Sequence, residues 1–206
     1  MTPAGLRVYP GYFDAAAQAA LRDAVLSALR VAPLFTPVMP RTGKPFSVQM
    51  TNLGPLGWVS DRAGYRYQPR HPATGAPWPE MPAMILGLWQ ALADYPHGPE
   101  ACLVNRYGAQ ARMGLHRDAD EDDFAAPVIS ISLGDTGLFR IGGLARGGPT
   151  QTLKLASGDV LVLGGAARLC YHGIDGIIAG SSRLLEGGGR INLTLRRVTK
   201  PVAAPA

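Results

Sequence analysis

Residues 190–196 read Arg-Ile-Asn-Leu-Thr-Leu-Arg, and their polar and apolar side chains alternate without a break. Successive side chains of a β-strand point to opposite faces, so the stretch predicts a strand with one apolar and one cationic face. Two placements fit the polar residues Arg190, Asn192, Thr194 and Arg196: an ordinary exposed surface, or the lining of a barrel. The alternation alone leaves both open.

Further short runs of β-forming residues precede this strand in the second half of the chain. Glycine-rich turns separate them, and no helical pattern lies between them. Many short strands without intervening helices predict an antiparallel sandwich or barrel, of which the jelly roll is one form. The expected fold class is mainly β (α+β), with strands at residues 102–107, 128–133, 138–141, 152–155, 160–163 and 191–198.

Two amphipathic helices are predicted in the first half of the chain. Asp14 suits a helix N-cap, and Leu21, Val25 and Leu29 follow it at four-residue spacing up to about residue 30. A second helix is predicted from Pro82 to about residue 92, because its apolar residues recur every three or four positions. Both helices are expected to support a sheet.

The composition limits the architecture. A chain of 206 residues with 47% hydrophobic side chains buries one substantial core, so residues 1–206 are expected to form a single domain. We expect the helices in residues 1–99, the strand-rich core in residues 100–198, and a disordered tail in residues 199–206, which lack periodicity.

Charge and cysteine content narrow the class of partner and of metal site. The net charge of +5 fits a partner with phosphates, and two cysteines are too few for a disulfide framework or a cysteine-rich zinc site. Any metal would therefore bind to His and carboxylate side chains. The longest apolar run, residues 160–167, is too short to cross a bilayer, and no signal-peptide pattern opens the chain, so a cytoplasmic location is expected.

A candidate metal site consists of His116, Asp118 and His172. The first two lie two positions apart, which places their side chains on one side of an extended backbone, and His172 follows an apolar strand later in the chain. Two His and one carboxylate on one face of an ion form the pattern of non-haem Fe(II) oxygenases. The alternative is a surface pair of His116 and Asp118 with His172 hydrogen-bonded in the core.

The polar face of residues 190–196 supplies a possible partner to that metal. Two guanidinium groups, Arg190 and Arg196, can bind the two carboxylates of a dicarboxylic acid through charge-assisted hydrogen bonds. Asn105 and Tyr107, two positions apart on another predicted strand, can add neutral hydrogen bonds. Together these groups meet the needs of a 2-oxoglutarate site.

With these residues and their order along the chain, the sequence resembles the AlkB family of Fe(II)- and 2-oxoglutarate-dependent dioxygenases. The resemblance is a series of collinear motifs from about residue 47 to residue 197, which chance does not produce in order. The motifs are Met-Thr-Asn (50–52), Leu-Gly-Trp (56–58), Gly-Tyr-Arg-Tyr (64–67), Pro-Trp-Pro (77–79), Asn-Arg-Tyr (105–107), His-Arg-Asp-Ala-Asp-Glu (116–121), Gly-Gly (142–143), Tyr-His-Gly (171–173) and Arg-Ile-Asn-Leu-Thr-Leu-Arg (190–196).

The resemblance implies a double-stranded β-helix (jelly roll) that carries a nucleotide-recognition lid within residues 1–99. It also implies Fe(II), 2-oxoglutarate and O2 as metal and co-substrates. The implied metal ligands, which are the catalytic residues, are His116, Asp118 and His172, and the implied co-substrate residues are Asn105, Tyr107, Arg190, Asn192 and Arg196.

The same matching implies substrate-binding residues. Trp58 corresponds to the aromatic ring that stacks on a flipped base, with His116 on the opposite side of the base. Tyr65 corresponds to a lid residue that contacts the phosphate of the target strand. The nearby arginines would give this stretch the basic and aromatic character of a nucleic-acid surface, although a solvated loop with core aromatics also fits.

Three further positions follow from the resemblance. Asp120 and Glu121 correspond to carboxylates that face the base pocket, where they would favour a base made cationic by alkylation. Arg146 corresponds to a residue beside the substrate. Cys170 departs from the family pattern, which has an aromatic residue there, and it fits either a packing residue or an oxidation-sensitive thiol.

The implied activity is oxidative dealkylation of 1-methyladenine and 3-methylcytosine in DNA, with RNA as a further substrate, and with single or double strands open. Hydroxylation of the alkyl carbon would release an aldehyde and restore the base. A monomer without an obligate protein partner is expected. Two alternatives remain: an oxygenase that acts on a protein or small molecule, and a catalytically silent, metal-containing nucleic-acid-binding module.

Overall fold

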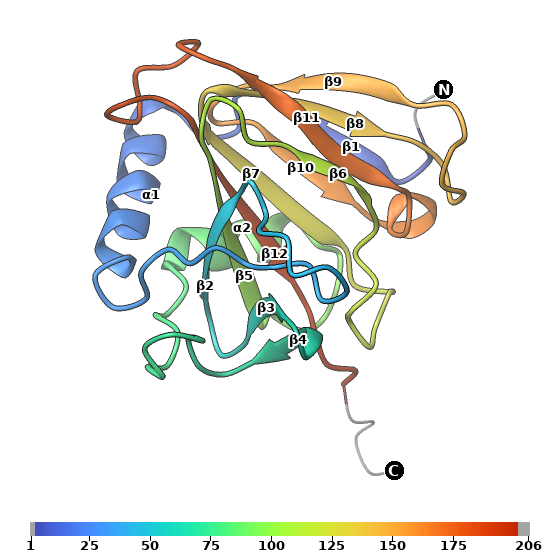
Figure 1. The fold of residues 1–206 in the computed structure, drawn as a ribbon. Helices are drawn as coiled ribbons and strands as arrows, with labels where there is room; N and C mark the ends of the chain where they lie inside the picture. Colours follow the sequence, from blue (N-terminus) through green and yellow to red (C-terminus); the bar gives the residue numbers. More distant parts are fainter. Residues whose placement is uncertain (1–2, 202–206) are drawn as a thin grey trace.

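The computed structural model describes residues 3–201, and two antiparallel β-sheets face each other in it (Figure 1). The larger sheet has six strands, and strands distant in sequence lie side by side because the chain crosses repeatedly between the two sheets. Its order is β1 (Leu6–Tyr9), β10 (Val160–Leu163), β7 (Val128–Gly134), β12 (Arg190–Arg196), β5 (Ala101–Tyr107) and β2 (Gln49–Leu53).

The smaller sheet has four strands and closes the second side of the jelly roll. Its order is β6 (Met113–His116), β11 (His172–Ile178), β8 (Thr136–Ile141) and β9 (Gln151–Leu155). The register of β11 shifts against β6 after His172, where the strand begins. Such irregularities bend a strand and re-aim its side chains, and this one lies beside a predicted metal ligand.

Strand β12 separates two cores. Its odd-numbered residues, Ile191, Leu193 and Leu195, belong to the core between the larger sheet and the helices. Its even-numbered residues point into the space between the sheets, and Arg190 and Arg196 are only 1% and 6% exposed there. An exposed polar face is therefore excluded, and the barrel-lining placement of the 190–196 stretch is confirmed.

The two predicted helices pack on the outer face of the larger sheet. Helix α1 (Ala15–Ala28) begins after Asp14, whose Oδ1 accepts a hydrogen bond from the Ala17 amide at 2.8 Å. A cap of this kind stabilises a helix by about 1 kcal/mol. Helix α2 (Ala83–Leu92) follows Pro82 and buries Trp89 in the same core. Both helix predictions are confirmed.

A two-stranded hairpin, β3 (Gly57–Asp61) and β4 (Gly64–Gln68), lies at one end of the sheets (Figure 1). The side chain of Asn52 holds it by pairing with both backbone groups of Trp58: the Trp58 amide donates to Oδ1 at 3.0 Å, and Nδ2 donates to the Trp58 carbonyl at 3.1 Å. The hairpin therefore starts from a rigid edge strand, which fixes where Trp58 points.

All six strands predicted from the sequence are present within a few residues of their expected ends. The sequence patterns missed β1, β2, β3, β4, β6 and β11, which are short or interrupted by glycine. Strands β1, β2, β6 and β11 form through pairing with distant partners, and β3 and β4 pair with each other. Because β1 and β2 extend both edges of the larger sheet, the jelly roll is not confined to residues 100–198.

The predicted C-terminal tail is partly described. Thr199, its first residue, is ordered because its amide donates to Oε2 of Glu100 at 2.6 Å and its hydroxyl donates to Oε1 at 2.7 Å. Residues 202–206 of the predicted tail lie outside the described residues. Within residues 3–201, no helix is long and apolar enough to cross a membrane.

Candidate active site

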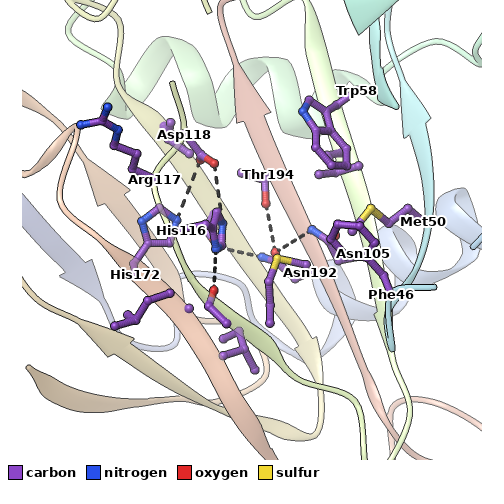
Figure 2. Close-up of a pocket in the computed structure, with 18 of the residues that line it drawn as sticks. Phe46, Met50, Trp58, Asn105, His116, Arg117, Asp118, His172, Asn192 and Thr194 are labelled. Atoms are coloured by element: carbon purple, nitrogen blue, oxygen red, sulfur yellow. Dashed lines mark hydrogen bonds and ion pairs between the residues drawn. The ribbon is translucent and has the colours of Figure 1, made fainter. Parts of the chain in front are cut away.

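A cavity of about 680 Å³ opens between the two sheets and the β3–β4 hairpin. Figure 2 shows His116, Asp118 and His172 pointing toward one another on one side, with Trp58 across the cavity from them. Every residue that the sequence analysis assigned to a site lines this one cavity: His116, Asp118, His172, Asn105, Tyr107, Arg190, Asn192, Arg196, Trp58, Tyr65, Asp120, Glu121 and Arg146.

The candidate metal ligands come from three elements. His116 is the last residue of β6, Asp118 lies two residues beyond it, and His172 begins β11, which pairs directly with His116. Nε2 of His116 lies 3.8 Å from Oδ1 of Asp118, and Nε2 of His172 lies 4.0 Å from Oδ2. One donor atom from each residue therefore lies within 4.8 Å of the other two.

Both imidazoles are oriented by the backbone. Nδ1 of His116 donates to the Gly114 carbonyl at 2.9 Å, and Nδ1 of His172 donates to the Cys170 carbonyl at 3.0 Å. A proton on Nδ1 leaves the Nε2 lone pair directed at the ion. Burial, followed by the neighbouring His116, lowers the pKa of His172 to about 4, so its ring is neutral near pH 7.

The carboxylate of Asp118 is kept ionised by its neighbours. Burial by itself would raise its pKa, but Arg196, the two imidazoles and Arg168 outweigh that effect and hold the pKa below its usual range. Arg196 donates to Oδ2 from Nε at 3.1 Å and from Nη2 at 2.9 Å. An ionised, hydrogen-bonded carboxylate is the form that binds a divalent cation.

Arg190 lies near the other end of the same strand face and forms no ion pair within residues 3–201. Its Nη2 donates to Ser132 Oγ at 2.9 Å, and its guanidinium lies 5.3 Å from the centre of the Tyr107 ring. Among the described residues, its Nε and Nη1 are buried without a hydrogen-bond partner. Burial lowers the pKa of Arg190, since the charge is removed from water.

Amide and hydroxyl groups lie between Arg190 and Arg196 in the cavity. Oδ1 of Asn192 accepts from Nδ2 of Asn105 at 3.2 Å and from the Thr194 hydroxyl at 3.0 Å, as Figure 2 shows. Nδ2 of Asn192 donates to Ser130 Oγ at 2.7 Å. Oδ1 of Asn105 has no partner within the described part of the chain, so a hydrogen-bond acceptor faces the cavity.

The mouth of the cavity is aromatic and carries one carboxylate. The Trp58 ring stacks on Tyr65, with 5.6 Å between ring centroids and 18° between planes. Its Nε1 donates to Oδ2 of Asp120 at 2.8 Å. Tyr65 is half exposed, so its hydroxyl is accessible from outside. Arg146 donates to the Leu115 carbonyl at 3.0 Å, which holds it beside the strand of His116.

Glu121 lines the cavity, but its carboxylate is already engaged. Oε2 accepts from Arg168 at 3.0 Å, and Oε1 lies 3.4 Å from Nε of Arg196. Oε1 also accepts the hydroxyl of Tyr67, whose pKa burial raises well above its usual value. The carboxylate with an exposed approach to the cavity mouth is therefore Asp120, rather than Glu121.

Comparison with known proteins agrees with this geometry. Residues 5–196 match the model of the 2OG-Fe(II) oxygenase superfamily. The chain is 58% identical to the alpha-ketoglutarate-dependent dioxygenase AlkB homolog of Caulobacter vibrioides over 94% of this chain and 87% of that protein. It is 47% identical to alpha-ketoglutarate-dependent dioxygenase AlkB of Escherichia coli over 77% of this chain and 74% of that protein. The chain belongs to the AlkB family.

A solved structure of OsALKBH1 extends the family likeness to the fold. It superposes with a TM-score of 0.78 at 30% identity and covers 96% of this chain and 99% of that chain. The jelly-roll prediction is therefore confirmed. As a 2OG-Fe(II) oxygenase of the AlkB family, this protein is an enzyme that uses Fe(II), 2-oxoglutarate and O2.

The polar groups of the cavity fit those components. Two imidazole Nε2 atoms and one ionised carboxylate match the donor preference of Fe(II), and three protein ligands would leave positions open for other ligands. The partnerless Nε and Nη1 of Arg190 are buried cationic donors, and Arg196 has a buried, partnerless Nη1 within the described residues. Two buried guanidiniums with free donors suit a dicarboxylate.

Several residues that line the AlkB-family cavity or hold its side chains were missed from the sequence: Ser130 and Tyr67 line the cavity, and Ser132 binds Arg190 without lining it. Ser130 and Ser132 of β7 bind Asn192 and Arg190, and Tyr67 of β4 binds Glu121. The signal for the two serines was present: they occupy alternate positions of an otherwise apolar strand. Nothing in the local pattern distinguishes Tyr67 from Tyr65, because both lie on β4 and line the cavity, and only the packed structure leaves Tyr65 half exposed and pairs Tyr67 with Glu121.

The surroundings of Cys170 bear on the two interpretations that the sequence left open. It precedes β11, its side chain is buried among the apolar residues between the sheets, and it is absent from the cavity lining. Its Sγ lies 3.5 Å from the Ala166 carbonyl, and burial raises the pKa of the thiol. The surroundings favour the packing interpretation over an oxidation-sensitive thiol.

Proposed function

We propose that this enzyme oxidatively dealkylates N-alkylated bases of nucleic acid, with 1-methyladenine and 3-methylcytosine in DNA as substrates and RNA as a further one. The observation that carries the proposal is a single cavity with a His-Asp-His cluster, a buried cation without an anion, and an accessible aromatic ring opposite the cluster. Each feature serves a different component of the reaction.

We assign the metal to His116, Asp118 and His172, and the co-substrate to Asn105, Tyr107, Arg190, Asn192 and Arg196. With 2-oxoglutarate and O2 bound, Fe(II) supplies the oxidation, and the chain supplies position and exclusion of water. Arg190 offers two donors to a carboxylate at the closed end of the cavity, and Arg196 has one nitrogen available beside Asp118. The Asn105 amide can orient the part of 2-oxoglutarate that lies between its two carboxylates.

We assign the base to the aromatic mouth. Trp58 would stack on one face of an extruded base and His116 would meet the other, since a base inside a duplex cannot enter a buried cavity. Tyr65 is half exposed beside Trp58, where its hydroxyl can reach a backbone phosphate. Arg146, held next to the His116 strand, completes the rim.

Asp120 provides selectivity in this proposal. A base alkylated at a ring nitrogen carries a positive charge, and the Asp120 carboxylate at the cavity mouth would favour it over a neutral base. Glu121 lines the same cavity, although its charge is balanced by Arg168 and Arg196. Two other relatives are named DNA N(6)-methyladenine demethylase and tRNA demethylase, which supports nucleic acid as the substrate class.

The proposal includes a monomer that acts in the cytoplasm without an obligate protein partner. The cavity brings together the candidate metal cluster, both arginines and the aromatic mouth, so the proposed reaction calls for no residue from a partner. Size-exclusion chromatography with light scattering would test the monomer, and turnover by the purified chain alone would test its independence of partners.

The direct test uses single-stranded DNA with one 1-methyladenine, incubated with the enzyme, Fe(II), 2-oxoglutarate and O2. We expect formaldehyde release together with loss of the methyl group by mass spectrometry, and neither product when Fe(II) or 2-oxoglutarate is omitted. Consumption of 2-oxoglutarate with an unchanged oligonucleotide would favour a protein or small-molecule substrate. No consumption at all would favour a silent binding module.

A further inference from the structure

One buried arginine outside the assigned site binds the loop that carries Asp118. Arg168 follows the short helix η1 (Gly165–Ala167) and lies shortly before His172 in sequence. It is only 2% exposed, and its side chain crosses to the segment between β6 and β7. A buried guanidinium must have its donors satisfied, so its partners show what it does in the fold.

All three hydrogen bonds of Arg168 go to that one segment. Nη1 donates to the backbone carbonyl of Asp118 at 2.8 Å, Nη2 donates to Oε2 of Glu121 at 3.0 Å, and Nε donates to the Ala126 carbonyl at 2.9 Å. The ring of Phe124, from the same segment, lies 5.4 Å from the guanidinium carbon. One planar group therefore contacts the beginning, middle and end of the loop.

The loop needs such a contact because it contains no helix or strand between β6 and β7. Without side-chain anchors, a segment of this kind samples many conformations, and ordering it costs conformational entropy. The metal site, in contrast, needs the Asp118 carboxylate to stay beside His172, whose Nε2 lies 4.0 Å from Oδ2 of Asp118. Arg168 lies four residues before His172 in the sequence and donates a hydrogen bond to the Asp118 carbonyl. It therefore links the segment that carries His172 to the loop that carries Asp118.

Glu121 completes the same arrangement from the loop side. Its side chain is 1% exposed, and it is the ionic partner of Arg168 within the described residues. Its second oxygen accepts the Tyr67 hydroxyl and lies near Nε of Arg196, the arginine that also binds Asp118. Each carboxylate oxygen is occupied by the protein itself, which leaves Glu121 poorly suited to contact a base.

We propose that Arg168 and Glu121 are positioning residues that clamp the Asp118 loop against the His172 segment and so preorganise the metal site. The inference rests on the metal ligands assigned in the proposed function. It changes the expected role of Glu121, which acts through Arg168 and the loop rather than by direct contact with the substrate. Residues that orient metal ligands commonly change metal affinity or activity by about 10- to 100-fold.

The test measures Co(II) binding in the absence of O2, because Co(II) substitutes for Fe(II) and its visible absorption reports ligand geometry. Arg168→Lys keeps the charge, but a single ammonium cannot reach three separated acceptors. We expect its Kd for Co(II) to rise about tenfold or more, with altered absorption bands. Wild-type affinity and an unchanged spectrum in the folded variant would overturn the proposal.

Glu121→Gln separates positioning from substrate contact. As a positioning residue, Glu121 should weaken Co(II) binding and lower kcat when changed, with the KM for methylated oligonucleotide within about twofold of wild type. A raised oligonucleotide KM with unchanged Co(II) affinity would instead identify Glu121 as a base contact and refute the clamp.

Two further variants keep the test decisive if a single substitution unfolds the chain. The double variant Arg168→Met with Glu121→Gln removes both charges, so no unpaired charge stays buried, and it should still bind Co(II) weakly. Arg197→Lys is the matched control, because Arg197 also pairs with a glutamate, Glu100 at 3.4 Å, and donates to a backbone carbonyl at 2.9 Å outside the cavity.

Arg197→Lys should keep wild-type Co(II) affinity even if its Tm falls. An equal loss of Co(II) affinity in the Arg168 and Arg197 variants would mean general destabilisation and would overturn the clamp. A wild-type chain that binds no Co(II) would overturn the metal assignment itself, so the two failures are distinguishable.

Discussion

The two ends of the cavity hold arginines from the same face of β12, in opposite electrostatic situations. At one end, Arg196 binds Asp118 at 2.9 Å, and Glu121 and Arg168 complete a balanced group of two cations and two anions. At the other end, Arg190 is buried as well, with 1% exposed, but has no acidic partner among the described residues. Burial alone therefore does not separate the two; the missing counterion does.

The difference indicates that the Arg196 end of the cavity holds its side chains in fixed positions and that the Arg190 end binds a ligand. A balanced buried group holds its members in place and is costly to break on one side only. A buried cation without an anion destabilises the free protein, and a bound carboxylate would supply the missing charge. The predictions below test this contrast, from the largest expected effect to the smallest.

Removing the anion at the balanced end should have the largest effect. Asp118→Ala loses a metal ligand and leaves two buried cations, Arg196 and Arg168, with Glu121 as one remaining anion. Turnover should fall below detection, and the protein should lose about 3–5 kcal/mol of stability. Chemical denaturation measures the stability, and Co(II) titration measures the metal site. Normal turnover in this variant would refute its assignment as a ligand.

The two arginines should respond in opposite directions to the same substitution. Arg190→Met removes an uncompensated charge, so the free protein should gain on the order of 1 kcal/mol in stability, while the KM for 2-oxoglutarate rises at least about 100-fold. Arg196→Met leaves Asp118 and Glu121 without that cation, so the free protein should lose stability. Thermal unfolding with and without 2-oxoglutarate measures both; destabilisation by both substitutions would contradict the contrast.

Trp58 lies at the mouth of the cavity, away from Arg190 and Arg196. Its substitution should therefore affect the binding of the nucleic-acid substrate alone. Trp58→Ala removes a stacking surface worth about 1–3 kcal/mol per base, so the KM for methylated oligonucleotide should rise about 10- to 100-fold. The KM for 2-oxoglutarate should stay within about twofold of wild type. A parallel rise of both constants would show that the hairpin supports the whole cavity rather than the base.

The smallest effect should come from a neutral partner at the unbalanced end. Ser132→Ala removes the hydroxyl that accepts from Nη2 of Arg190. One neutral hydrogen bond contributes about 0.5–1.5 kcal/mol, so the affinity for 2-oxoglutarate should fall roughly two- to tenfold. Isothermal titration with a redox-inert metal measures this affinity, and a change as large as that of Arg190→Met would make Ser132 a principal determinant.

Local patterns in the sequence were sufficient for much of the fold and of the site. The N-cap at Asp14, the apolar spacing of the helices and the alternation in residues 190–196 are set by neighbouring residues, so their secondary structure followed from the sequence. The site residues that line the cavity were predicted from the collinear motifs shared with the AlkB family, since each motif contains residue types suited to one part of the chemistry. Strand β11 could not be predicted, because two glycines interrupt it and pairing with β6 and β8 creates it.

The sequence by itself determined the alternation of β12, the candidate ligands His116, Asp118 and His172, and the presence of two arginines on one strand face. Only the tertiary structure decided that this face lines the interior, that Arg190 lacks an anion, and that Glu121 is paired with Arg168. The physical reason is that charge balance depends on which distant segments share a buried space. Such proximity arises from strand pairing and packing across the whole chain, which no local pattern encodes.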